Sequence, residues 1–132
     1  MKKVLLDTNA YTALMRGDAA VVAKVQRSEG ICMSAVVVGE LLLGFRLGTR
    51  FSQNHQQLER FLSNPYVEFL PIARSTTEHI ASVAASLRRR GTPVPTNDMW
   101  IAAQALEHAV TVLSDDGHFG QVDGILWLRL AD

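Results

Sequence analysis

Short aliphatic runs alternate with helix-like segments along the whole chain, and this alternation constrains the fold more than any other feature of the sequence. Each run is rich in Val, Ile or Leu and is short enough for one strand, while the segments between them carry apolar residues at helical spacing. Strands that alternate with helices pair in parallel, because a parallel connection needs a crossover long enough to hold a helix. The sequence therefore predicts a three-layer α/β/α protein with a central parallel sheet of about five short strands.

Local signals place the boundaries of these elements. We expect strands at residues 3–6, 31–33, 66–70, 110–113 and 125–128. We expect helices at residues 10–15, 19–27, 35–47, 51–62, 76–90 and 97–108. The expected helix N-caps are Asp18, Ser34, Ser75 or Thr76, and Thr96. A chain of 132 residues is long enough for one core and too short for two, so we expect residues 1–132 to form a single domain.

Composition and charge exclude several classes of protein. An apolar fraction of 48% with 20% charged residues excludes global disorder, and the balance of 13 basic and 13 acidic residues points to no polyanionic partner. The opening apolar run ends at Asp7, far short of a signal peptide, and no stretch approaches the roughly 20 apolar residues of a membrane span. The single cysteine, Cys32, lies in an apolar stretch and cannot form an intrachain disulfide. We therefore expect a buried thiol in a cytoplasmic protein that does not associate with membranes.

Four acidic residues occupy apolar or turn settings in which a carboxylate is costly without a function. They are Asp7 in VLLDTN, Glu40 in AVVVGELLLGF, Asp98 in PTNDMW and Asp116 in VLSDDGHF. Asp7 and Asp116 follow the first and fourth predicted strands, so both belong at the carboxyl edge of a parallel sheet, where ligands bind. Separated carboxylates that converge in a fold are suited to hold Mg²⁺ or Mn²⁺.

Glu40 has the strongest physical case for a function. Its helical neighbours are Val36, Val37, Leu43 and Gly44, so no polar stripe surrounds it. A lone buried carboxylate is strongly destabilising unless it is paired, neutralised or bound to a metal. The alternative is a glutamate satisfied by a buried arginine or by backbone donors.

The other acids have structural alternatives. Asp7 could simply cap the following helix, and Asp98 in the first helical turn would gain about 0.3–1 kcal/mol from the helix dipole. Asp115 and Asp116 compete for one position, because successive side chains after a strand point to opposite sides. We favour Asp116, because Ser114 then lies on the same side two residues earlier.

Other residues give weaker signals. The four histidines show no metal-ligand spacing and are expected on the surface or on helix faces; they are His55, His79, His108 and His118. Trp100 is expected to pack in the core or at a dimer face rather than to stack on a base. No cysteine nucleophile, GxSxG turn or P-loop competes with an acidic site.

Four motifs in order give the chain a resemblance to a known family. They are LLDTN at residues 5–9, SAVVVGELLLG at 34–44, NDMWIAA at 97–103 and LSDDGHF at 113–119. In this order and spacing the whole chain resembles a PIN domain of the small VapC toxin type. The resemblance implies a metal-dependent endoribonuclease, in which metal-activated water attacks an RNA phosphodiester in line and no covalent intermediate forms. It also implies a toxin that is neutralised by a cognate antitoxin.

The family's catalytic acids carry over onto residues of this sequence. By resemblance, the catalytic residues and ligands of Mg²⁺ (or Mn²⁺) are Asp7, Glu40, Asp98 and Asp116. Thr8, Asn9 and Ser114 match polar positions that orient the acids or a metal-bound water. Ser114 stands where threonine is common, and Asp115 stands where a basic or neutral residue is common, which keeps the choice between Asp115 and Asp116 open.

Partners are inferred from charge and apolar surface. Arg88, Arg89 and Arg90 precede Asp98 closely and could contact RNA phosphates, or could form only a solvated helix end. The predicted helices at 36–47 and 51–62 carry more apolar residues than one small core needs. We expect an antitoxin segment to bind there and the domain to form a two-fold homodimer.

Two other functions remain open. One is an acidic-site nuclease that acts on DNA, and the other is a Mg²⁺-binding interaction domain without hydrolytic activity. A haloacid-dehalogenase-type phosphatase is disfavoured, because it would need an aspartate where Asn9 stands.

Overall fold

The protein contains one five-stranded parallel sheet. The computed structural model describes residues 2–131, so the first and last residues of the predicted domain, Met1 and Asp132, lie outside the described residues. The strand order is β3-β2-β1-β4-β5, and every neighbouring pair is parallel. The strands are β1 (Val4–Leu6), β2 (Ile31–Ser34), β3 (Val67–Leu70), β4 (Thr111–Leu113) and β5 (Leu126–Leu128). The predicted sheet is confirmed.

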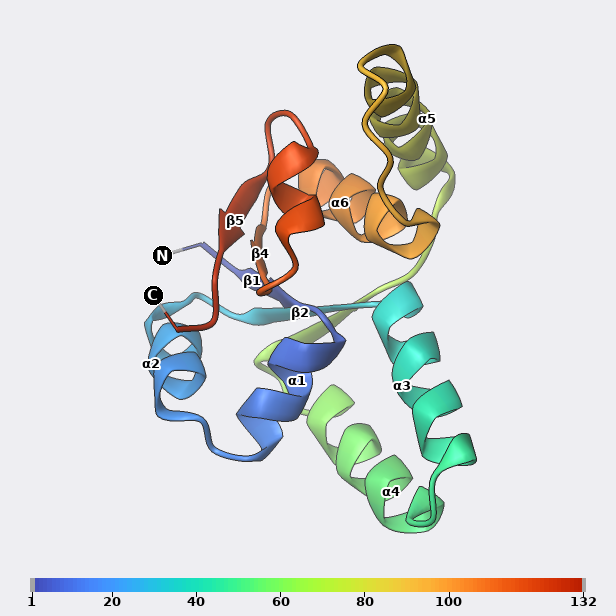
Figure 1. Ribbon diagram of the computed structural model, residues 1–132. Coiled ribbons are helices and arrows are strands. Elements are labelled where there is room, and N and C mark those ends of the chain that lie inside the picture. The colour runs from blue at the N-terminus through green and yellow to red at the C-terminus, as the bar shows by residue number, and fades with distance from the viewer. Residues whose placement is uncertain (1, 132) are drawn as a thin grey trace.

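Helices cover both faces of this sheet. Figure 1 shows α1, α2 and α4 on one side and α5, α6 and the short 3₁₀ helix η1 on the other, with α3 beside α4 at the carboxyl end of β2. The helices are α1 (Thr8–Met15), α2 (Ala19–Arg27), α3 (Ala35–Leu47), α4 (Phe51–Leu62), α5 (Arg74–Arg89), α6 (Thr96–His108) and η1 (Gly117–Gln121). The predicted α/β/α layering is therefore confirmed, and η1 is an element that the sequence did not predict.

Two predicted helix caps are wrong. Helix α6 begins one residue early, with Pro95 as its N-cap: the ring fixes φ at −56°, and the Pro95 carbonyl accepts a hydrogen bond from the Met99 N–H. Helix α5 has Ala73 as its N-cap, and the hydroxyl of Thr76 accepts the Ala73 N–H at 3.0 Å. Thr76 thus caps the helix from inside its first turn.

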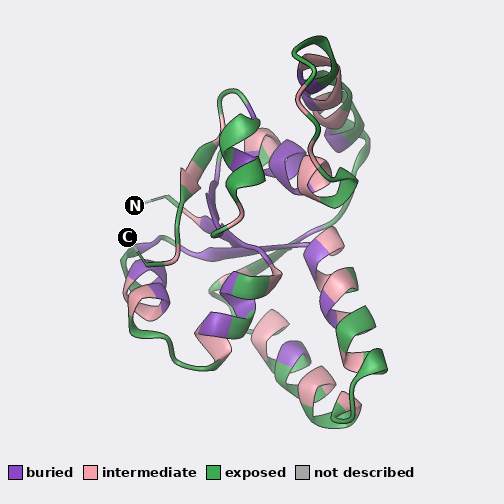
Figure 2. Ribbon diagram, viewed as in Figure 1, coloured by how far each residue is buried: buried purple, intermediate pink, exposed green. Residues whose placement is uncertain are grey.

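The core lies between the central strands and the helices. All residues of β1, β2 and β4 are buried, whereas the edge strands β3 and β5 are partly exposed. Figure 2 shows the same gradient, from buried central strands to exposed outer helix faces. Cys32 is buried as predicted, and burial raises the pKa of its thiol to about 11. Between residues 2 and 131, no helix combines the length and apolarity needed to cross a bilayer.

Side chains at the carboxyl ends of the strands cap the helices that follow. Asp7 after β1 accepts the Ala10 N–H at 2.8 Å, and Ser34 at the end of β2 accepts the Val36 N–H at 2.9 Å. Asp116 after β4 accepts the His118 N–H at 2.9 Å and begins η1. These caps gather polar side chains at one edge of the sheet, where the candidate site lies.

Candidate functional site

Asp7 is held rigidly between β1 and β4. One carboxylate oxygen caps α1, and the other accepts a hydrogen bond from the hydroxyl of Ser114. The same Ser114 hydroxyl accepts the backbone N–H of Asp116 at 2.9 Å. Burial raises the pKa of Asp7, and the two hydrogen bonds from Ser114 and Ala10 partly oppose that increase. Ser114 therefore links Asp7 to Asp116 across a sequence separation of more than a hundred residues.

Asp98 and Asp116 face each other at the mouth of the site. Asp98 extends from the first turn of α6, and its side chain is only 16% exposed. Burial raises the pKa of Asp98 to about 7, together with a hydrogen bond to Asp116 and the negative charge of that residue. Burial also acts on Asp116, but hydrogen bonds from the His118 backbone and from Asp98 lower the pKa of Asp116. Two carboxyl groups in contact share a proton in this way because both cannot easily be ionised without a cation.

His118 completes this group. Its Nδ1 lies 2.8 Å from Oδ1 of Asp116 and 3.6 Å from Oδ2 of Asp98. One ligand atom from each of the three residues lies within 4.8 Å of the others. The sequence prediction placed His118 on the surface with no role in the site. Its ring is about half exposed, but it faces the two acids, and the only signal for this was its position two residues after Asp116.

Glu40 lies beside this group and is bound by two side chains. Its Oε1 accepts the hydroxyl of Thr8 at 3.3 Å, and its Oε2 accepts the amide of Asn97 at 3.2 Å. Glu40 is half-buried and Leu43 beside it is exposed, so the premise of a buried carboxylate without polar neighbours is wrong. The side chains that satisfy it come from α1 and α6, not from its own helix. Asn97 was not among the predicted site residues, although it directly precedes Asp98.

Asp115 and Asn9 point to another part of the molecule. Oδ1 of Asp115 accepts the backbone N–H of Leu130 at 2.8 Å, and the backbone carbonyl of Asp115 accepts a hydrogen bond from Nη1 of Arg129 at 3.0 Å. Asn9 is exposed and lines a hollow of about 340 Å³ together with Asp115. Asp116, in contrast, contacts Asp98. Successive side chains after β4 thus point to opposite sides, as expected, and this separates Asp115 from Asp116.

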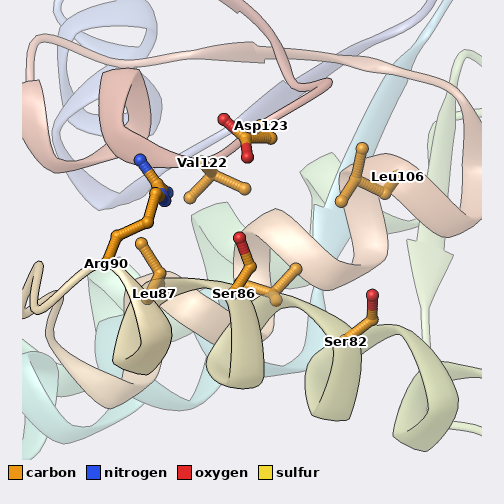
Figure 3. A pocket seen from close by; sticks show the side chains of 8 residues that line it. Ser82, Ser86, Leu87, Arg90, Leu106, Val122 and Asp123 are labelled. Atoms are coloured by element: carbon orange, nitrogen blue, oxygen red, sulfur yellow. The ribbon is translucent and has the colours of Figure 1, made fainter.

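The three arginines lie at the end of α5. Arg88 and Arg89 are exposed in the last turn, whereas a guanidinium nitrogen of Arg90 donates to the carbonyl of Gln121. Figure 3 shows Arg90 at the rim of a hollow of about 270 Å³ between α5 and the segment that holds Val122 and Asp123. Within residues 2–131, no hydrogen bond or ion pair connects these arginines to the acidic site.

The donor set fits a divalent cation. One carboxylate oxygen of Asp98 and one of Asp116 lie within 4.8 Å of each other. The charge of Glu40 contributes to the raised pKa of Asp98, and the charge of Asp116 contributes to the raised pKa of Asp7. The pKa of Asp98 is raised first by burial and then by the neighbouring Asp116, and a cation beside the pair would oppose both effects by stabilising the ionised carboxylates. Oxygen ligands of this type are those that Mg²⁺ and Mn²⁺ prefer.

The chain is thus an α/β protein with a carboxylate site, suited to a divalent cation, at the carboxyl edge of a parallel sheet. The family model of the PIN domain matches residues 4–125, and the chain belongs to this family.

Known relatives match it along nearly its full length. The chain is 27% identical over 128 residues to the tRNA(fMet)-specific endonuclease VapC of Shigella flexneri, which covers 95% of this chain and 96% of that protein. It is 26% identical over 128 residues to Ribonuclease VapC1 of Haemophilus influenzae, with 93% and 94% covered. Its structure is similar to the crystal structure of DNA-bound VapBC from Salmonella typhimurium, with a TM-score of 0.83, 25% identity, and 98% and 99% covered. The predicted resemblance to VapC-type PIN domains is confirmed.

Proposed function

We propose that this chain is a ribonuclease that hydrolyses RNA phosphodiester bonds and acts as the toxin of a toxin–antitoxin pair. One observation carries the proposal: acids from four separate segments converge at one sheet edge in a chain that is similar over nearly its whole length to proteins named as ribonucleases. The converging acids are Asp7, Glu40, Asp98 and Asp116.

The proposed cofactor is Mg²⁺, with Mn²⁺ as an alternative. Asp98 and Asp116 would hold the cation, with Glu40 and Asp7 completing the negative site around it. A bound cation supplies positive charge that keeps these acids ionised, polarises a water molecule and offsets charge on the phosphate.

The chain's own side chains orient this machinery. Thr8 and Asn97 fix both oxygens of Glu40, while Ser114 fixes Asp7 and the backbone of Asp116. Hydrogen bonds to the outer oxygens of site carboxylates hold them in a defined geometry, which lowers the cost of ordering them during the reaction. Burial and the neighbouring Asp116 raise the pKa of Asp98 to about 7, so below that pH Asp98 must release a proton before it can act as a carboxylate ligand.

RNA contacts are proposed for the exposed end of α5. Arg88 and Arg89 are free to present guanidinium groups to phosphate oxygens. Arg90 donates to the carbonyl of Gln121, so we assign it to holding the end of α5 against the last residue of η1.

The proposed antitoxin surface is the exposed apolar part of α3. Leu43 and Leu47 are 60% and 80% exposed, and a groove of about 430 Å³ beside them is lined by Val36, Ile72 and Trp100. The groove also reaches Glu40, so a segment bound there would cover the site as well as the apolar surface. We also propose that the exposed apolar surface outside this groove forms the interface of a two-fold homodimer.

The direct test is cleavage of a mixed RNA pool with Mg²⁺ or Mn²⁺. The native chain should cleave, whereas Asp7→Asn and Glu40→Gln should not, because each removes one acid with little change in volume. Single-stranded DNA of matched length is the control substrate. Equal RNA cleavage by all three proteins would contradict the proposed mechanism, and preferential cleavage of DNA would contradict the proposed substrate.

A further inference from the structure

His118 brings a nitrogen atom into direct contact with the two acids of the proposed cation site. Its Nδ1 lies 2.8 Å from Asp116 and 3.6 Å from Asp98, and the ligand atoms of the three residues lie within 4.8 Å of one another. Three ligand atoms this close together could serve one cation.

Core packing does not explain this orientation of the ring. The His118 side chain is 48% exposed, and the neighbouring Phe119 is the residue of η1 that is buried in the core. The backbone of His118 is held by Asp116, whose Oδ1 accepts the His118 N–H and lies 2.8 Å from the ring Nδ1. The ring is thus directed by the two acids, and its Nδ1 faces the place where their charge is concentrated.

We propose that His118 is a ligand of the site's cation through Nδ1, and that this nitrogen makes the site prefer Mn²⁺ to Mg²⁺. The inference rests on the function proposed above, because it concerns the same cation site.

The selectivity follows from ligand chemistry. Mg²⁺ binds almost entirely to oxygen and retains several of its waters. Mn²⁺ also favours oxygen ligands, but as a transition metal it accepts an imidazole nitrogen more readily than Mg²⁺ does. Asp98 and Asp116 supply charge to either cation and discriminate weakly between them, since both cations accept carboxylate oxygen. A nitrogen ligand beside the two acids therefore shifts the preference toward Mn²⁺.

Pulsed electron paramagnetic resonance of the Mn²⁺-loaded full chain, without RNA, tests this inference. The native spectrum should contain a ¹⁴N coupling from one directly bound imidazole. Labelling of histidine with ¹⁵N should replace it with a ¹⁵N coupling. His118→Asp, which replaces the nitrogen ligand with an oxygen ligand, should bind Mn²⁺ without the coupling. His118→Asn, which adds no charge, is a second variant, and circular dichroism checks the folding of both.

His79→Ala is the matched control. His79 is a partly exposed histidine on α5 whose ring contacts the Ser75 carbonyl, so its removal should leave the ¹⁴N coupling intact. In competition titrations, the preference for Mn²⁺ over Mg²⁺ should fall by at least about tenfold in both His118 variants, the lower end of the effect of perturbing a metal site.

The failure of this inference can be distinguished from the failure of the proposed function. Bound Mn²⁺ without a ¹⁴N coupling, or a coupling that persists in the His118 variants, would overturn the inference while RNA cleavage still supports the nuclease. A native chain that neither binds Mn²⁺ nor cleaves RNA would overturn both.

Discussion

Asp7 and Asp98 are carboxylates of the same candidate site, yet the protein surrounds them in opposite ways. Asp7 is buried and has both oxygens satisfied, one by the first turn of α1 and the other by Ser114. Asp98 lies at the mouth of the site against Asp116, and this contact with a second acid helps burial raise its pKa to about 7. The hydrogen bonds of Asp7 are supplied by the chain itself, whereas the Asp98–Asp116 pair keeps negative charge that a cation would compensate.

This difference means that two acids of one site contribute to the stability of the fold in opposite ways. A carboxylate that caps a helix and accepts a buried hydroxyl stabilises the fold without any ligand. Two carboxylates in contact destabilise the metal-free fold because they repel each other, and a bound cation would relieve this repulsion. Changes on the two sides of the site should therefore have different consequences.

The largest effect is expected for Asp98→Asn. The amide removes a charge from the proposed cation site, and we expect RNA cleavage to fall on the order of 10³-fold, as for other losses of one electrostatic group in a catalytic site. Without metal, the variant should melt at a higher temperature than the native chain, because the contact between two acids is relieved. Added Mg²⁺ should raise the melting temperature of the native chain but not that of the variant. A variant that cleaves normally would show that the two sides of the site do not differ as described.

The second effect is a pH dependence that arises on the Asp98 side. Below about pH 7 a cation must displace a proton from Asp98, so its affinity should fall by about tenfold for each pH unit, as measured by calorimetry.

The stability of the metal-free protein should also depend on pH through the ionisation of Asp98. The folded pKa of Asp98 is raised from 3.8 to about 7, so its contribution is fully present below pH 4 and is lost as pH rises toward 7. The lowered pKa of Asp116 acts in the opposite direction, but only in the acid range below its ordinary value. Thermal unfolding in a chelator at pH 5 and 7.5 should show this loss, and Asp98→Asn should reduce it. An unchanged pH dependence in Asp98→Asn would contradict the assignment.

The smallest effect is expected on the Asp7 side, for Ser114→Ala. This change leaves one buried oxygen of Asp7 and the partly buried N–H of Asp116 without their partner, which costs about 1–3 kcal/mol of unfolding free energy. Ser63→Ala is the matched control, because its exposed hydroxyl only donates to a helix carbonyl. Chemical denaturation with and without Mg²⁺ measures both. Equal stability losses in the two variants would show that Ser114 does not hold the Asp7 side together.

Most of the fold and part of the candidate site could be predicted from the sequence. The five strands were predictable because each is a short aliphatic run, and Asp7 and Asp116 were predictable because residues that follow parallel strands share one edge. The hydrogen bonds of Glu40 were not predictable, since its partners lie 32 and 57 residues away and depend on how α1 and α6 approach α3. His118 was missed for a related reason: its neighbour Asp116 is local, but Asp98 comes from another helix.

The sequence by itself determined the order of the elements, the parallel sheet and the presence of acids at its carboxyl edge, because these follow from local periodicity and from the direction of strands. Only the tertiary structure decided which acid is satisfied and which is left with excess charge. That distinction separates Asp115, bound to Leu130, from Asp116, which faces Asp98. The environment of a carboxylate is set by groups brought together from distant parts of the chain, and no local pattern records their distances.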